Sequence, residues 1–274
     1  MYNVRLFDYP NGAQLRIYKS LVVTPEKVQE KKEFFVAKNP WGHEYVLVER
    51  MKDEKEKHEH CVHSSLSRTI NTIYSYSRSN TWDWFVTLTF NPELVNSFDY
   101  SECTKKLSVW LSNLRRDCPD MKYLIVPEKH KSGRYHFHGL FANCDNIKMV
   151  DSGKRTSKGQ VIYNIGKYRL GFSTATAVSD NSRVTKYICK YVTKELAEST
   201  FNKRRYWCSK NLHQVESQDM IMTQEEIEGL KSKLAAEILH SKSMGGQFQT
   251  VTYVELSSDI DYYKLLYERK NEND

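Results

Sequence analysis

Two tyrosines, Tyr187 and Tyr191, are each followed three residues later by a lysine, Lys190 and Lys194. On a helix, residues four positions apart lie one above the other, so this spacing predicts a row of tyrosines beside a row of lysines. Phenols can attack a phosphodiester, and ammonium groups can neutralise the charge that develops during the attack. The same spacing also fits an amphipathic helix with half-buried tyrosines and solvated lysines. The helix itself is predicted by an apolar stripe and by preceding residues with capping oxygens (Val184, Ile188, Val192 and Leu196; Asp180, Asn181 and Ser182).

A pair of histidines lies upstream, in the alternating aromatic segment from Tyr135 to Phe141. The alternation predicts a strand, and a strand sends His136 and His138 to the same face. Two imidazoles on one face can form half of a metal site. An ordinary strand with its polar residues in solvent is the alternative interpretation.

A carboxylate can join the two histidines if the preceding segment folds back on them. Residues 123–128 predict a strand, and Ser132-Gly133 predicts a turn before the histidine strand. An antiparallel hairpin with an even register sum would place Glu128 on the face that carries His136 and His138. Two nitrogens and one carboxylate would then hold a divalent ion and leave positions open for water and substrate oxygens. His130 has the same parity and is a weaker fourth candidate because it lies in the predicted turn.

A third segment, Trp84 to Phe90, alternates aromatic or aliphatic residues with threonine and predicts a buried strand. With the other two segments it completes an ordered set: a Thr-Leu-Thr strand, then His-x-His, then Tyr-x-x-Lys. Over residues 64–212 the chain resembles the rolling-circle replication initiators of the HUH endonuclease superfamily, in particular the small Rep proteins of bacterial plasmids and single-stranded DNA phages. The doubled Tyr-x-x-Lys is similar to that of the two-tyrosine phage-type enzymes.

The resemblance implies a fold, a reaction and partners. It implies a central antiparallel sheet with helices packed on it, like that of HUH and RRM domains, and Mg²⁺ or Mn²⁺ held by His136, His138 and Glu128. Tyr187 or Tyr191 would nick single-stranded origin DNA and form a 5′-phosphotyrosine, and the second tyrosine would resolve the circle. Lys190 and Lys194 would stabilise the developing charge. Single-stranded and duplex origin DNA are the expected substrates.

Host proteins are expected partners as well. No Walker motif is present, since Gly153-Lys154 lacks the earlier glycine that a phosphate loop needs at position 148, which is lysine. An initiator of this kind would therefore depend on the helicase and polymerase of its bacterial host.

Charge and aromatic residues independently favour nucleic acid. The net charge is +7, and residues 183–210 contain eight basic residues against two acidic ones. Basic residues interleaved with Tyr206 and Trp207 suit a polyanion whose bases can stack. A solvated basic helix end would explain the charge but not the aromatics. The predicted DNA-binding residues are Arg183, Lys186, Lys203, Arg204 and Arg205.

Cysteine usage and hydropathy set the expected compartment. The six cysteines are scattered, so neither a disulfide framework nor a Cys-x-x-Cys zinc site is indicated, and a reduced cytoplasm is expected. The cluster from His58 to His63 follows a charged run and is assigned to a solvated helix or linker rather than to a zinc site. No apolar run approaches the roughly 20 residues that span a bilayer, and no signal-peptide pattern opens the chain.

The chain is predicted to be α+β with three parts: an N-terminal β-rich extension (1–63), an endonuclease core (64–212) and a C-terminal helix-strand extension (213–274). Asn11-Gly12 predicts a hairpin turn, and Thr223-Gln-Glu-Glu226 predicts a capping box that opens a helix to about His240. The remaining expected elements are strands around a turn at 39–42, helices at 64–78 and 101–117, an exposed loop at 143–162 and a strand at 248–256.

Other protein classes fit less well. A conjugative relaxase normally carries its tyrosine before the histidines, and a single-tyrosine transposase has no need of a second Tyr-x-x-Lys. A cupin-like metalloprotein would place glutamate four or five residues after the second histidine, where this chain has Ala142 and Asn143. A non-catalytic nucleic-acid-binding module would explain the charge but leave the histidines, glutamate and tyrosines without a role.

Overall fold

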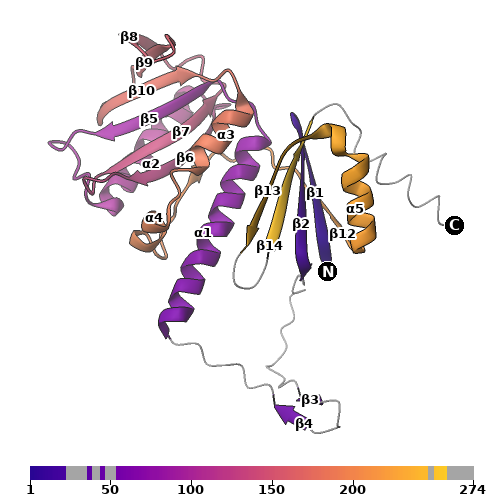
Figure 1. Ribbon diagram of the computed structural model, residues 1–274. Helices are drawn as coiled ribbons and strands as arrows, with labels where there is room; N and C mark the ends of the chain where they lie inside the picture. Colours follow the sequence, from indigo (N-terminus) through magenta and orange to yellow (C-terminus); the bar gives the residue numbers. More distant parts are fainter. Residues whose placement is uncertain (23–35, 39–43, 47–53, 246–249, 258–274) are drawn as a thin grey trace. The chain divides into compact units, whose positions relative to one another are not determined.

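The computed structural model describes residues 1–22, 36–38, 44–46, 54–245 and 250–257 (Figure 1). These residues form an α+β fold of antiparallel sheets and helices, as predicted. The chain divides into two compact units, one comprising Met1–Phe7, Gln14–Cys61 and Ser217–Ser257, and the other Asp8–Ala13, Val62–Glu216 and Ser258–Asp274. No helix in the described ranges is long and apolar enough to cross a membrane.

A seven-stranded sheet forms the centre of the larger unit (Figure 1). Its neighbouring strands pair antiparallel. In spatial order the strands are β11 (Trp207–Cys208), β6 (Lys122–Lys129), β7 (Tyr135–Ala142), β5 (Trp84–Phe90), β10 (Gly171–Ala177), β9 (Val161–Ile165) and β8 (Met149–Arg155).

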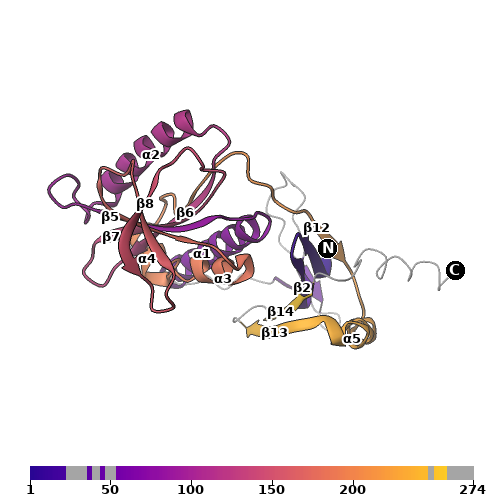
Figure 2. The same cartoon turned by 90° about the horizontal axis from the view of Figure 1, so that it is seen from above.

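Helix α2 (Tyr100–Asp117) covers one face of this sheet, as predicted for residues 101–117 (Figure 2). Asp99 caps its first turn by accepting hydrogen bonds from the backbone N–H groups of Ser101 and Glu102. The indole of Trp110 stacks on Phe141 of β7, with ring centroids 6.2 Å apart. The buried stripe of α2 therefore fixes which residues of β7 face the core.

Helices α1 (Glu54–Arg78), α3 (Asn181–Cys189) and α4 (Lys194–Ser199) lie on the side of the sheet opposite α2 (Figure 2). The prediction of one continuous helix through both tyrosines is wrong, because α3 ends at Cys189 and α4 begins at Lys194. The Thr193 hydroxyl accepts a hydrogen bond from the Leu196 N–H and so caps a new helix. Tyr191 consequently lies in the turn between the two helices.

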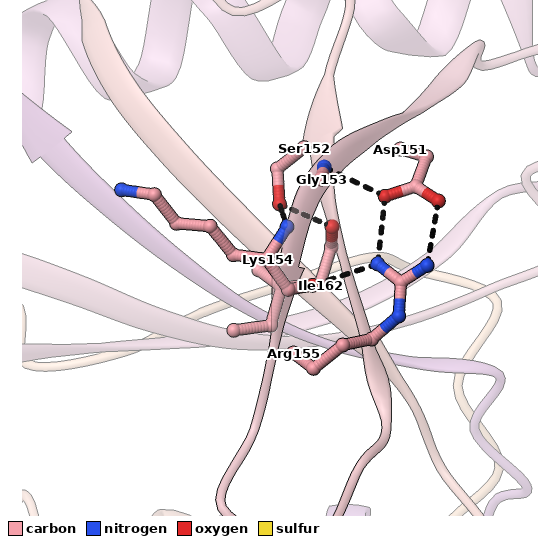
Figure 3. Close-up of polar contacts among 6 residues, drawn as sticks. All are labelled: Asp151, Ser152, Gly153, Lys154, Arg155 and Ile162. Carbon is pink, nitrogen blue, oxygen red and sulfur yellow. Dashed lines mark hydrogen bonds and ion pairs between the residues drawn. The ribbon is translucent and has the colours of Figure 1, made fainter.

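The edge of the sheet is a hairpin of β8 and β9, where the sequence predicted only an exposed loop. The polar residues of β8 reflect its edge position, since most of its side chains lie in solvent. A bulge interrupts the pairing between Asp151 and Lys154, and Gly153 in it has a φ of 73°. Figure 3 shows Asp151 bound to the Arg155 guanidinium, with the closest atoms 3.0 Å apart. Such a bulge disturbs the open edge and hinders pairing with another chain.

The smaller unit contains a five-stranded sheet in the order β12 (Ser217–Met220), β1 (Tyr2–Tyr9), β2 (Gly12–Val22), β14 (Thr250–Leu256) and β13 (Ile238–Gly245). Strands from the two ends of the chain thus share one sheet. The predicted Asn11-Gly12 turn is confirmed, and Gly12 has a φ of 109°. A separate pair, β3 (Val36–Lys38) and β4 (Glu44–Val46), is antiparallel, while the predicted turn between them lies outside the described residues.

The predicted capping box of Thr223 and Glu226 is confirmed at the start of α5 (Gln224–Lys233). The helix is shorter than predicted, however. It is followed by a 3₁₀ turn, η1 (Ala235–Glu237), and residues 238–240 belong to β13. Pairing with β14 outweighs the helical preference of these residues.

Gly139 gives a test of the packing that holds the histidine strand in place. An added Cβ at this position would lie 2.9 Å from Cγ1 of Ile125 and 3.1 Å from Cγ2 of Val86, on the two flanking strands. We expect Gly139→Ala to lower the free energy of unfolding by about 1–3 kcal/mol, as overpacking does. Urea denaturation measures this, with Val109→Ala on the exposed side of α2 as a control expected within about 0.5 kcal/mol of wild type. An unchanged midpoint for Gly139→Ala would contradict the packing.

Candidate active site

One row of side chains crosses four strands on the face opposite α2. Glu128 of β6 lies directly opposite His136 of β7, His136 opposite Thr89 of β5, and Thr89 opposite Phe172 of β10. Residues directly opposite each other project to the same face of a sheet. The predicted even register of the β6–β7 hairpin is therefore confirmed, and Glu128 lies on the face of the two histidines.

Threonines hold both imidazole rings. The Thr87 hydroxyl lies 3.1 Å from Nδ1 of His138, and the Thr89 hydroxyl lies 3.1 Å from Nδ1 of His136. Each ring therefore has its Nδ1 engaged and its Nε2 directed elsewhere. The alternation of threonine in the Thr-Leu-Thr strand was the sequence signal for these contacts, but the sequence analysis assigned the threonines no role.

Glu128 and His138 form a hydrogen-bonded pair, with 2.7 Å between Oε2 and Nε2. His138 is buried, and one third of the Glu128 side chain is exposed. If the carboxylate accepts from Nε2–H, then Nδ1 of the neutral ring accepts from the Thr87 hydroxyl. A hydroxyl can both donate and accept, so Thr87 can also support the ring when Nε2 is deprotonated.

The electrostatics favour an ionised carboxylate beside a neutral imidazole. The hydrogen bond with His138 lowers the pKa of the Glu128 carboxyl, although partial burial acts in the opposite direction. Burial lowers the pKa of His136, and the nearby His130 adds to this effect. These are the protonation states in which both groups can bind a metal ion.

The donor set suits a divalent cation, but its members do not yet form a closed site. Among the described residues, no three His, Cys, Asp or Glu side chains are arranged closely enough to hold a metal ion as they stand. His130 lies in the β6–β7 turn with its Nδ1 3.0 Å from the Ser132 hydroxyl and its ring centroid 5.4 Å from that of His136. The fit rests on the oriented imidazoles and the carboxylate beside them.

Both tyrosines reach this face despite the interrupted helix. The Tyr191 ring stacks on His138, with centroids 3.6 Å apart and an angle of 12° between the planes. Tyr187 packs edge-on against Tyr191 at 5.4 Å and is 46% exposed. Phe85 of β5 supports both, at 5.2 Å from Tyr187 and 6.4 Å from Tyr191. Tyr191 is thus in direct contact with the histidine pair, and Tyr187 lies nearer to solvent.

The Tyr191 phenol is protonated at neutral pH. Burial, followed by the hydrogen bond with Tyr187 and the charge of Glu128, raises its pKa well above the ordinary value. Any group that neutralises Glu128 would remove one of these causes.

The two lysines separate, so the predicted lysine row is wrong. Lys190 follows α3, and its Nζ lies 5.9 Å from the centroid of the Tyr187 ring. Lys194 begins α4, is well exposed and lies 3.7 Å from Glu198. The sequence analysis did not single out Lys129, which follows Glu128 and lies 3.5 Å from Glu195 of α4.

The predicted DNA-binding residues divide into two groups. Four are exposed: Arg183, Lys186, Lys203 and Arg204. Arg205 is instead buried, and its guanidinium donates hydrogen bonds to the Thr200 hydroxyl, the Ser65 hydroxyl and the Ala197 carbonyl. The structure gives it a structural role.

The aromatics that favoured base stacking are also largely occupied. Trp207 is 6% exposed and packs edge-on against Phe137, with ring centroids 5.6 Å apart. Tyr206 is half-buried and lies 6.5 Å from Tyr76. Pairing of Trp207 with Ile125 at the edge of the sheet explains this burial.

Neighbouring arginines test this division. We expect Arg205→Ala to lower the free energy of unfolding by about 2–4 kcal/mol, because buried hydrogen-bonding partners lose their donor. Arg204→Ala, one residue away and exposed, should change it by no more than about 0.5 kcal/mol. Urea denaturation of both variants makes the comparison, and equal stabilities would contradict the structural role of Arg205.

Comparison with known proteins adds a family. Residues 83–196 match a family model whose description is that of a replication-associated protein, ORF2. The matched segment runs from the start of β5 into α4 and contains the threonine, histidine and tyrosine segments, although it is less than half of the 274-residue chain. No curated protein and no solved structure gives a significant match. The family match supports a role in DNA replication and, with it, the prediction of a replication initiator.

Proposed function

We propose that this protein nicks and rejoins single-stranded DNA at the origin of a rolling-circle replicon, through a covalent phosphotyrosine. The observation that carries the proposal is the stacking of Tyr191 on His138, which is itself hydrogen-bonded to Glu128. A nucleophile, an oriented imidazole and a carboxylate thus meet on one open face. The match to a replication-associated family supports the choice of DNA as substrate.

Glu128, His136 and His138 are the residues that would hold Mg²⁺ or Mn²⁺. When bound, such an ion withdraws charge from the scissile phosphate and so makes the phosphorus easier to attack. Thr87 and Thr89 hold the two rings in fixed orientations, the function that outer-shell hydrogen bonds serve at metal sites.

The tyrosines carry out the exchange of bonds. One phenol loses its proton to solvent, and its oxygen forms a bond to phosphorus while the bond from phosphorus to the 3′ oxygen breaks. The leaving oxygen takes a proton, which gives a free 3′-hydroxyl that a polymerase can extend and a 5′-phosphotyrosine. Because the phosphodiester energy is retained in that linkage, rejoining needs no ATP.

Lys190 and the second tyrosine complete the cycle. Lys190, close to the Tyr187 ring, is positioned to stabilise negative charge near the attacked phosphate. The second phenol attacks the regenerated origin after one round of synthesis and releases a circle by a second transesterification. Duplex unwinding and synthesis fall to a helicase and a polymerase of the bacterial host, in whose cytoplasm the protein would act.

The metal ligands give the first test. His136→Ala and His138→Ala should each reduce Mn²⁺-dependent nicking by more than about 100-fold and weaken Mn²⁺ binding in calorimetry, while duplex binding changes little. Thr87→Val should cost roughly 10- to 100-fold, as loss of an outer-shell partner does. Glu128→Ala should be partly restored by excess metal.

The assay follows conversion of supercoiled origin-bearing DNA to an open circle attached to protein. His213→Ala is the matched control, since this exposed histidine lies outside the candidate site. Normal nicking by either His136→Ala or His138→Ala at ordinary Mn²⁺ would show that the site is misassigned.

The tyrosines give the second test. The double variant Tyr187→Phe, Tyr191→Phe should form no SDS-resistant adduct with DNA, because both nucleophiles are absent while the rings still pack. Each single variant should keep partial cleavage of an oligonucleotide but lose efficient release of circles. Full production of single-stranded circles by one single variant would establish a one-tyrosine scheme instead.

A further inference from the structure

An exposed aromatic ring continues the row that contains the candidate metal ligands. Phe172 of β10 lies opposite Thr89, which lies opposite His136, so all three side chains project to the same face. Two strand spacings put the backbone of Phe172 about 10 Å from that of His136. The Phe172 side chain is 52% exposed, although large apolar side chains on this sheet are otherwise mostly buried.

A hollow of about 490 Å³ lies at this end of β5 and β10. Its apolar wall includes Phe172 and Leu94, and Leu94 is 53% exposed. Arg169 supplies a positive charge at the rim and forms no ion pair with other residues that the structure describes. Thr89 lines the hollow while its hydroxyl contacts His136, so the hollow adjoins the candidate active site.

Backbone groups form the floor of the hollow. Gly171 starts β10 and lies so close to the end of β5 that an added Cβ would clash with the Thr89 carbonyl oxygen and the Asn91 nitrogen. The Tyr168 hydroxyl donates a hydrogen bond to the same carbonyl, at 3.3 Å. The Phe172 ring is therefore presented from a tightly held strand rather than from a loop.

We propose that this hollow binds one base of the DNA strand, next to the nucleotide whose phosphate is cleaved. The base stacks on Phe172 against Leu94, and Arg169 contacts an adjacent phosphate. An unpaired base offers the flat face that an aromatic ring requires, whereas the bases of a duplex stack on one another. The proposal rests on the proposed function, since it extends the same DNA strand along the row from His136 to Phe172.

Binding of a labelled oligothymidylate of about 20 nucleotides to the full chain, measured by fluorescence anisotropy in EDTA, tests this subsite. Loss of one stacked base should weaken binding by Phe172→Ala about 5- to 100-fold, and Phe172→Trp should restore it. Arg169→Ala should reduce the salt dependence of binding by about one phosphate contact. Val109→Ala, which removes an exposed apolar side chain from α2, should bind like wild type.

Two further measurements separate the subsite from the chemistry. Oligothymidylate should quench the added fluorescence of Phe172→Trp if a base stacks on the ring. Binding by Phe172→Ala equal to that of wild type would overturn the subsite, and so would failure of the wild type to bind. Formation of a covalent adduct by wild type would in either case leave the proposed function standing. Loss of binding by Phe172→Ala in a protein that forms no adduct would instead support the subsite and contradict nicking.

Discussion

The antiparallel register of β6, β7 and β5 is the constraint on which the candidate site depends. Because side chains alternate between faces, a slip of one residue would turn His136 and His138 toward the buried face beneath α2. Phe137 and Phe141 prevent such a slip, since both are fully buried on that face. The polar row and the hydrophobic core are therefore set by the same pairing, and substitutions that disturb one should disturb the other.

Short-range contacts then convert a shared face into an arrangement that can do chemistry. The hydroxyls of Thr87 and Thr89 fix the two imidazoles, and the turn after α3 brings the Tyr191 ring onto His138. A continuous helix would have kept Tyr191 on the helical face above Tyr187. The Thr193 cap thus has a functional consequence, because ending one helix and starting another places the two phenols at different depths.

Burial separates residues that composition alone groups together. Arg205 and Trp207 lie in the basic, aromatic segment that suggested nucleic-acid binding, yet both are 6% exposed and pack within the larger unit. Phe172 lies in a segment with no special composition, yet half of its side chain is exposed beside the candidate site. Contact with DNA is therefore better inferred from exposure and position on the sheet than from the local density of charge.

The sequence by itself determined the α+β class, the strands with period-two alternation, the helix caps at Asp180 and Thr223, and the shared face of Glu128 and the histidines. These features depend on neighbouring residues or on one hairpin register, which local patterns encode. Only the tertiary structure decided the break before Lys194, the pairing of polar residues 149–155 at the sheet edge, and the burial of Arg205. Each of these depends on partners distant in the chain, such as Ser65 for Arg205, and a local pattern cannot specify such partners.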